Sequence, residues 1–119
     1  MLMGVYGTLK QGNQNHQIHL DQKSIFSGYV DFHAKMYSNG RYPMLVKTLT
    51  LQQIYFEIYE ISDDQLVSID GLELPFGYHR ELCEFDQVGQ AWVYFYSSSI
   101  IPNDFILVES GCFEKEREW

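Results

Sequence analysis

The residues best suited to chemistry lie in two short segments, residues 5–10 near the start of the chain and residues 70–80 in its middle. In the first, Gly7 follows a short apolar run, and a residue without a Cβ atom lets successive backbone N–H groups converge on an anion. In the second, Glu73 stands between two leucines, next to a proline and a glycine that interrupt regular structure. A carboxyl group on a constrained turn in apolar surroundings is a candidate general base. The two segments together predict a binding loop and an acid–base residue.

Other kinds of site find less support in the sequence. No G-x-S-x-G motif is present, and neither cysteine lies in a motif that activates a thiolate, so a covalent protein nucleophile is not indicated. The four histidines have no spacing typical of a metal site, and no acidic cluster completes a ligand set. We therefore expect neither a metal nor another cofactor.

Length and composition predict a single domain over residues 1–119 with an aromatic core, since hydrophobic residues make up 45% of the chain and aromatic ones 16%. The formal net charge of −8 disfavours nucleic acid and anionic membranes as partners. Cys83 and Cys112 have no paired spacing, and the N-terminal apolar stretch is interrupted by Gly4, Gly7 and Lys10. The cysteine and N-terminal patterns therefore predict a reduced, cytoplasmic setting. The protein is expected to be a monomer or homodimer.

Apolar patterns and turn residues predict the elements that must position these segments. Ser62 and Gln65 form a capping box for a helix over 63–69, and residues 54–61 are apolar on both faces, as in a strand buried on both sides. A hairpin is predicted from residues 79–85 and 91–96, with Trp92, Tyr94 and Tyr96 on one face. Further strands are expected at 3–6, within 25–37 and at 44–46, and a brief helix at 16–20. Short strands without strict alternation with helices predict an α+β domain built on a curled sheet or small barrel.

Four motifs, in this order, resemble the γ-glutamylcyclotransferase-like family over most of the chain. They are Val5-Tyr6-Gly7-Thr8-Leu9, Gly40-Arg41-Tyr42-Pro43, Asp70-Gly71-Leu72-Glu73 with Tyr78 and Arg80 at the expected offsets, and Val93-Tyr94-Phe95-Tyr96. The resemblance implies a small mixed β-barrel flanked by short helices. It also implies a cofactor-independent enzyme that releases a γ-glutamyl group as 5-oxoproline, because the substrate's α-amine attacks its own γ-carbonyl.

The resemblance also assigns roles to residues. Glu73 becomes the catalytic general acid/base, with a pKa raised by burial between Leu72, Leu74 and Phe76. The substrate-binding residues are Tyr6, Gly7, Thr8 and Leu9, whose backbone N–H groups hold the glutamyl portion, together with Tyr42 and Tyr78 at the pocket. The family's Gly-Asp-Trp near the C-terminus is replaced here by Gly111-Cys112-Phe113, which suggests an altered wall or lid.

Each of these residues also has a plainer interpretation. Glu73 alone would pass for a solvated turn residue, Gly7 for the end of a strand, and Tyr42 for part of a turn. Asp70 more commonly braces a turn than performs chemistry, and Lys10, although it could attract an anion, more commonly lies on the surface. Two other functions compete: a non-catalytic member that binds a small carboxylated metabolite, and a γ-glutamyl-removing enzyme of a biosynthetic pathway. The sequence does not indicate which amine is released.

Overall fold

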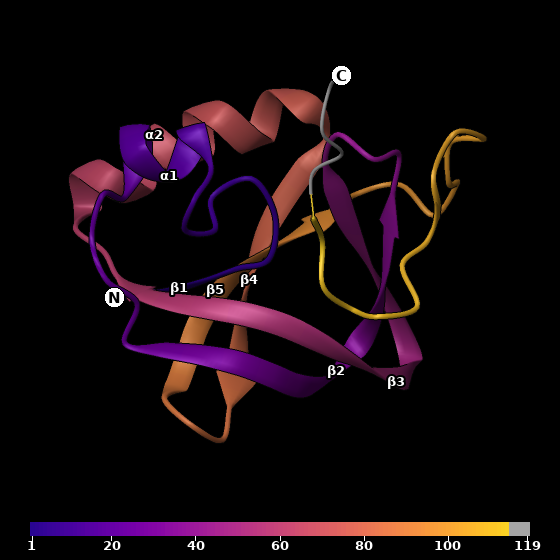
Figure 1. Ribbon diagram of the computed structural model, residues 1–119, viewed down its shortest axis with the longest axis horizontal. Helices are drawn as coiled ribbons and strands as arrows, with labels where there is room; N and C mark the ends of the chain where they lie inside the picture. Colours follow the sequence, from indigo (N-terminus) through magenta and orange to yellow (C-terminus); the bar gives the residue numbers. More distant parts are fainter. Residues whose placement is uncertain (115–119) are drawn as a thin grey trace.

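The computed structural model describes residues 1–114, and its strands form one six-stranded sheet in the order β4-β5-β1-β3-β2-β6 (Figure 1). The elements are β1 (Leu2–Val5), α1 (Gln14–His19), β2 (Phe26–Ser38), β3 (Pro43–Glu60), α2 (Asp63–Glu73), the 3₁₀ helix η1 (Leu74–Phe76), β4 (Tyr78–Phe85), β5 (Gly89–Tyr96) and β6 (Ile106–Leu107). Strand β1 pairs antiparallel with β3 and parallel with β5, so the sheet is mixed. Neither α1 nor α2 in this part of the chain has the length and apolar character needed to cross a membrane.

The sheet curls until its two ends approach each other. Phe32 on β2 and Phe85 on β4 stack with ring centroids 5.6 Å apart, although β5, β1 and β3 separate their strands in the sheet. Phe56 on β3 and Phe95 on β5 join the same aromatic cluster. The predicted α+β fold with a small, curled barrel is therefore confirmed.

The two faces of the sheet carry separate cores because successive side chains of a strand point to opposite sides. On β5, Ala91, Val93 and Phe95 pack inside the curl, whereas Trp92, Tyr94 and Tyr96 contact the second core. The second core also contains Ile69 of α2 and Leu20, the residue directly after α1, and Figure 1 shows the two helices side by side on that face. The predicted shared face of the three aromatic residues is confirmed.

The hairpin of β2 and β3 differs from the prediction in the length of its second strand. Strands were expected at 44–46 and 54–61, but β3 runs continuously from Pro43 to Glu60. Its middle is largely exposed, with Leu49 at 97% and Leu51 at 57%, so the short Thr-Leu alternation of residues 48–51 does not mark a buried strand face. Pairing with β2 continues on both sides of this segment, but residues 48–51 form a bulge without partners on β2, because the register shifts from Phe32–Gln52 to Ala34–Lys47.

Helix α2 begins as predicted and ends later. Ser62 and Gln65 form the expected capping box at its N-terminus. The helix continues to Glu73 rather than to residue 69, so Glu73 is the last residue of α2 and not part of an irregular turn. Pro75 fits at the start of η1, where its missing N–H is not needed, and the chain turns only at Gly77, which adopts φ +88°.

Candidate active site

A cavity of about 230 Å³ opens between the loop that follows β1 and the C-terminal end of α2. We call it the Glu73 cavity. Its lining comprises Gly4, Val5, Tyr6, Gly7, Thr8, Leu9, Asn15, Tyr42, Pro43, Leu72, Glu73, Phe76, Tyr78 and Tyr94. All seven residues predicted for the site are among them, although they come from three separate regions of the sequence. The structure thus brings the predicted residues together, and their roles remain predictions.

Glu73 is partly buried at the end of α2, with its side chain on the cavity wall. Burial raises the pKa of Glu73 to about 7. Within residues 1–114, no protein group donates a hydrogen bond to its carboxyl group. A carboxyl group in this state is divided between its protonated and ionised forms near neutral pH, which suits a group that both accepts and returns a proton.

The predicted apolar neighbours of Glu73 are found in part. Leu72 and Phe76 line the cavity with it, whereas Leu74 does not line it and is 48% exposed. Tyr6, Tyr78 and Tyr94 line the same cavity. Burial raises the pKa of each of these phenols, and charge on Glu73 raises it further; for Tyr94 the hydrogen bond to Asp70 is the second cause.

The loop after β1 is held close to the start of β3. A Cβ atom on Gly7 would lie 2.8 Å from Pro43 Cγ and 2.9 Å from Pro43 Cδ, closer than side chains pack. Gly7 is therefore required by this close approach rather than by a left-handed backbone conformation. The turn closes when the Lys10 N–H donates to the Gly7 carbonyl oxygen at 3.0 Å.

Several contacts hold the loop while leaving donors free. The Tyr6 hydroxyl donates to the Tyr94 carbonyl oxygen at 2.8 Å, and Asn15 Nδ2 donates to Thr8 Oγ1 at 2.9 Å. In the part of the chain that the structure describes, the backbone N–H groups of Gly7, Thr8 and Leu9 have no protein acceptor. Consecutive free N–H groups at a cavity form a site for a carboxylate or an oxyanion.

Tyr78 and Tyr42 occupy different depths of the cavity. The buried Tyr78 hydroxyl donates to the Pro43 carbonyl oxygen at 2.9 Å, which fixes the wall beside the Gly7 loop. Tyr42 is 46% exposed and lies at the mouth, where its ring is 5.7 Å from that of Phe105. Tyr78 is thus placed to shape the interior and Tyr42 the entrance.

Asp70 braces the site rather than lining it. Its carboxylate accepts hydrogen bonds from Arg80 Nε at 2.9 Å and from the Tyr94 hydroxyl at 2.5 Å. Burial acts to raise the pKa of Asp70, but these donors outweigh it and hold the pKa below its ordinary value. Arg80 also stacks over the Trp92 ring at 4.3 Å. These contacts fix the end of α2, and with it Glu73, against β4 and β5.

Lys10 is buried, so its interpretation as a surface lysine is wrong. Its side chain turns away from the Glu73 cavity, and Nζ donates to the Phe113 carbonyl oxygen at 2.5 Å and lies 5.4 Å from the centre of the Tyr55 ring. Cys112 Sγ is 3.7 Å from the same nitrogen. Lys10 therefore links the end of the loop to the C-terminal segment and does not attract an anion into the cavity.

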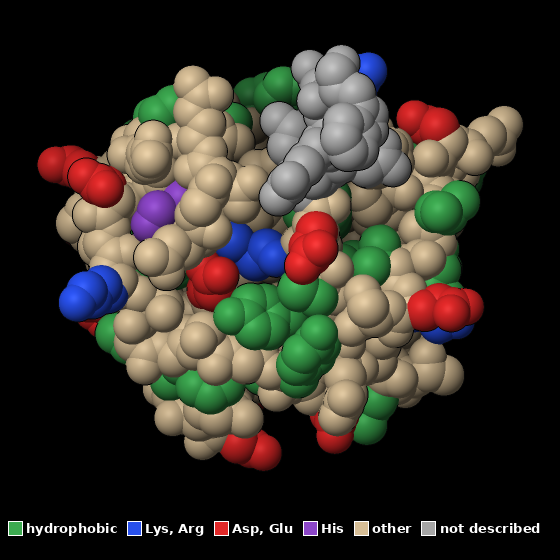
Figure 2. All heavy atoms as spheres, in the orientation of Figure 1, with side chains coloured by type: hydrophobic (Ala, Val, Ile, Leu, Met, Phe, Trp, Pro, Cys, Tyr) green, Lys and Arg blue, Asp and Glu red, His purple; other side chains and the backbone are tan. Residues whose placement is uncertain are grey.

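Figure 2 shows the acidic side chains spread over one face of the molecule rather than gathered in a patch.

Comparison with known proteins places this chain in a family. Residues 3–115 match the family described as "Gamma-glutamyl cyclotransferase, AIG2-like". The chain belongs to this γ-glutamyl cyclotransferase family. A protein from Methanocaldococcus jannaschii named "Putative gamma-glutamylcyclotransferase" is 34% identical over 119 residues, covering 95% of each chain. The family predicted from the sequence motifs is therefore confirmed.

Other curated relatives and solved structures are also similar to this chain. The "Gamma-L-glutamyl-butirosin B gamma-glutamyl cyclotransferase" of Niallia circulans is 31% identical over 104 residues, which cover 78% of this chain and 65% of that protein. The structure of protein ytfP from Escherichia coli is 32% identical with a TM-score of 0.67 and covers 95% of this chain and 96% of its own. An uncharacterised protein from Pyrococcus horikoshii, at 22% identity, covers 95% of this chain and 89% of its own and shares the fold with a TM-score of 0.77.

The departure from the family's C-terminal motif lies away from the Glu73 cavity. Gly111 adopts φ +68°, and a Cβ atom there would collide with the Gln53 carbonyl oxygen. Phe113 is buried in the aromatic core, and Cys112 and Phe113 contact Lys10. None of the three lines the Glu73 cavity, so the expected altered wall is not found in the described residues.

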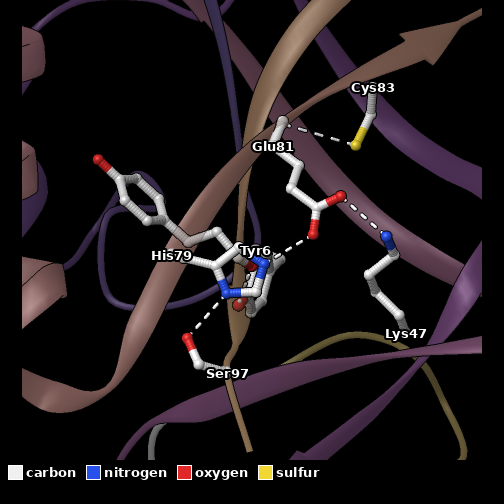
Figure 3. Close-up of polar contacts among 7 residues, drawn as sticks. Tyr6, Lys47, His79, Glu81, Cys83 and Ser97 are labelled. Atoms are coloured by element: carbon white, nitrogen blue, oxygen red, sulfur yellow. Dashed lines mark hydrogen bonds and ion pairs between the residues drawn. The ribbon is translucent and has the colours of Figure 1, made fainter.

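A second polar cluster in this family member lies on β4 and its neighbours (Figure 3). His79 Nδ1 is 2.8 Å from Ser97 Oγ, His79 Nε2 is 2.6 Å from Glu81 Oε2, and Lys47 Nζ donates to Glu81 Oε1 at 2.8 Å. This resembles a Ser-His-acid arrangement, but the Ser97 N–H donates to the Gly77 carbonyl oxygen at 2.9 Å and is not free for an oxyanion. Ser97 is also exposed and lines no cavity among residues 1–114. We interpret the cluster as a structural link between strands.

Among the lining residues that were not predicted as site residues, two have polar side chains, Tyr94 and Asn15. Tyr94 belongs to a motif of the family and was predicted to share a face with Trp92 and Tyr96, so the sequence contained a signal for it. Asn15 carried none, because its role depends on the contact with Thr8 across the loop.

Proposed function

We propose that this protein is a cofactor-independent γ-glutamyl cyclotransferase that releases 5-oxoproline from a γ-glutamyl amide, with Glu73 as general acid/base. The observation that carries the proposal is one cavity that holds both a partly buried carboxyl group, whose pKa is about 7, and a loop with three free N–H groups. The first can move protons at neutral pH, and the second can hold a carboxylate or an oxyanion. Family membership supports the same activity.

The reaction needs no protein nucleophile. The Glu73 carboxylate accepts a proton from the substrate's α-ammonium group, and the resulting amine attacks the γ-carbonyl carbon within the same molecule. A C–N bond forms and the carbonyl oxygen gains negative charge. Protonated Glu73 then returns its proton to the amide nitrogen, and the carbonyl group re-forms as the bond between this nitrogen and the carbonyl carbon breaks. The ring nitrogen loses its second proton to the Glu73 carboxylate, which passes it to the departing amine or to solvent. The products are 5-oxoproline and a free amine, and holding the chain in its reactive conformation supplies much of the acceleration.

The loop after β1 binds the glutamyl half in this proposal. The N–H groups of Gly7, Thr8 and Leu9 stabilise the substrate's carboxylate or the developing oxyanion, and Tyr6 anchors the loop through its bond to Tyr94. Tyr78 shapes the wall next to Glu73, and Tyr42 lies where the substrate enters.

Release of 5-oxoproline from γ-glutamyl amines, γ-glutamyl amino acids, γ-glutamyl-ε-lysine and glutathione tests the proposal. We expect release by the wild type and none by Glu73→Gln, with normal rates for Glu84→Gln, an exposed glutamate outside the cavity. Both variants should fold as the wild type does by circular dichroism.

The competing function is a non-catalytic binder of a small carboxylated metabolite. It rests on the same free N–H groups, and it makes no use of the raised pKa of Glu73. No release from any substrate, combined with calorimetric binding of glutamate by both wild type and Glu73→Gln, would favour the binder and contradict the enzyme.

A further inference from the structure

Within residues 1–114, no positive side chain lines the Glu73 cavity to receive a second carboxylate. Among its described lining residues, Glu73 is the only acidic group and there is no Lys, Arg or His. The N–H groups of the loop after β1 are committed to the glutamyl half in the proposed function. The part of the substrate beyond the γ-carbonyl therefore meets walls without a compensating cation.

Those walls are apolar and aromatic near the entrance. Leu72 lies on the last turn of α2, Phe76 on η1, and Tyr42 just before β3. Phe76 is 71% exposed and Tyr42 is 46% exposed, so two aromatic rings meet the solvent at one opening. Exposed aromatic rings that gather at a cavity mouth mark a surface for an apolar ligand group.

Phe76 is also held in place. The preceding Pro75 restricts the backbone of η1, and Gly77 turns the chain at φ +88° directly after it. A ring on such a short, constrained segment can contact a ligand at a small conformational cost.

A carboxylate next to the released nitrogen would lose water against these rings without gaining an ion pair, and the molecule's net charge of −8 adds further repulsion. An apolar or aromatic substituent at the same position gains ring contacts instead. Resting on the proposed cyclotransferase activity, we propose that the released amine is an apolar, preferably aromatic, amine that carries no carboxylate, and that Phe76 selects it.

A matched pair of substrates tests this directly. γ-Glutamyl-phenethylamine and γ-glutamyl-L-phenylalanine differ only in the carboxylate on the released amine, and γ-glutamyl-ethylamine lacks the ring. We expect kcat/KM for 5-oxoproline release to be at least about tenfold higher for the phenethylamine than for the phenylalanine compound, and several-fold higher than for the ethylamine compound.

Substitutions at position 76 test whether Phe76 is the residue that selects the released amine. Phe76→Arg places a cation at the mouth and should reduce the preference for the phenethylamine over the phenylalanine compound about tenfold, while Phe76→Leu should mainly reduce the advantage of the ring. Val67→Arg is the control, because Val67 is an equally exposed apolar residue of α2 outside the cavity and the substitution changes the net charge equally. Thermal unfolding checks that all three variants fold.

The outcomes separate the two claims. Equal kcat/KM for the matched pair would overturn this inference and leave the cyclotransferase proposal standing. An unchanged preference in Phe76→Arg would overturn the selection by Phe76. Absence of 5-oxoproline from every substrate would overturn the proposed function and this inference with it.

Discussion

At the scale of the residue, the central feature is a carboxyl group that retains its proton to about neutral pH. Burial raises the pKa of Glu73 from 4.5 to about 7, which means that the folded protein binds a proton that the unfolded chain has already lost in this range. The folded state is therefore progressively destabilised as the pH rises from 4.5 to about 7, and the penalty is fully present above that.

Glu73→Gln removes this penalty because glutamine does not ionise. We expect the free energy of unfolding of the variant to exceed that of the wild type by about 1–3 kcal/mol at about pH 8 and to match it closely at about pH 4. Urea unfolding of wild type, Glu73→Gln and the exposed control Glu84→Gln at both pH values measures the difference. The same difference at both pH values would show that ionisation of Glu73 is not its cause.

The sequence predicted which residues gather at the cavity better than it predicted their surroundings. Glu73 and the Gly7 loop could be proposed as site residues because a motif and its neighbours are local in sequence. That Tyr94 lines the same cavity as Glu73 could not be read locally, since it comes from a distant strand.

At the scale of the element, the loop after β1 depends on its packing against the start of β3. Gly7→Ala would bring a Cβ atom within 2.8 Å of Pro43 Cγ, so either the loop or β3 must shift. We expect a loss of about 1–3 kcal/mol in stability and a raised KM, because the free N–H groups move with the loop.

Gly71→Ala is the matched control for this substitution. A Cβ atom on Gly71 meets nothing within 4 Å, and Gly71 lies inside α2, so alanine should stabilise the protein by about 0.5–1 kcal/mol without changing KM. Thermal unfolding and steady-state kinetics of both variants give the comparison. Equal effects on KM would contradict the role of the Gly7–Pro43 contact.

Element types were largely predictable, and element ends were less so. The capping box fixed the start of α2, but Glu73 lies on the helix because Gly71 does not end it and Pro75 opens η1 instead. The exposed middle of β3 did not indicate that one strand runs from Pro43 to Glu60, and it is the pairing with β2 on both sides of the bulge that joins the two halves.

At the scale of the whole molecule, Lys10 connects parts of the chain that are 103 residues apart. Its buried ammonium group donates to the Phe113 carbonyl oxygen, while its own backbone closes the turn with Gly7. Burial of a lysine was not predictable from its local sequence, because its partners lie at the far end of the chain.

Lys10→Met should lower stability by about 1–3 kcal/mol, since the Phe113 carbonyl oxygen loses its partner, and should raise KM as the loop loosens. Lys23→Met, at an exposed lysine, is the control. Urea unfolding and kinetics with a γ-glutamyl amine measure both effects, and equal behaviour of the two variants would contradict the link between the C-terminal segment and the loop.

The most direct test of the account is the pH dependence of kcat/KM for 5-oxoproline release by wild type and Glu73→Gln. The proposed proton transfer predicts a wild-type profile that rises with pH and levels off above about pH 7, and a loss of about 10²-fold or more in the variant together with that acidic limb. A variant that keeps the wild-type rate, or the same acidic limb, would contradict the assignment of Glu73 as the acid–base group.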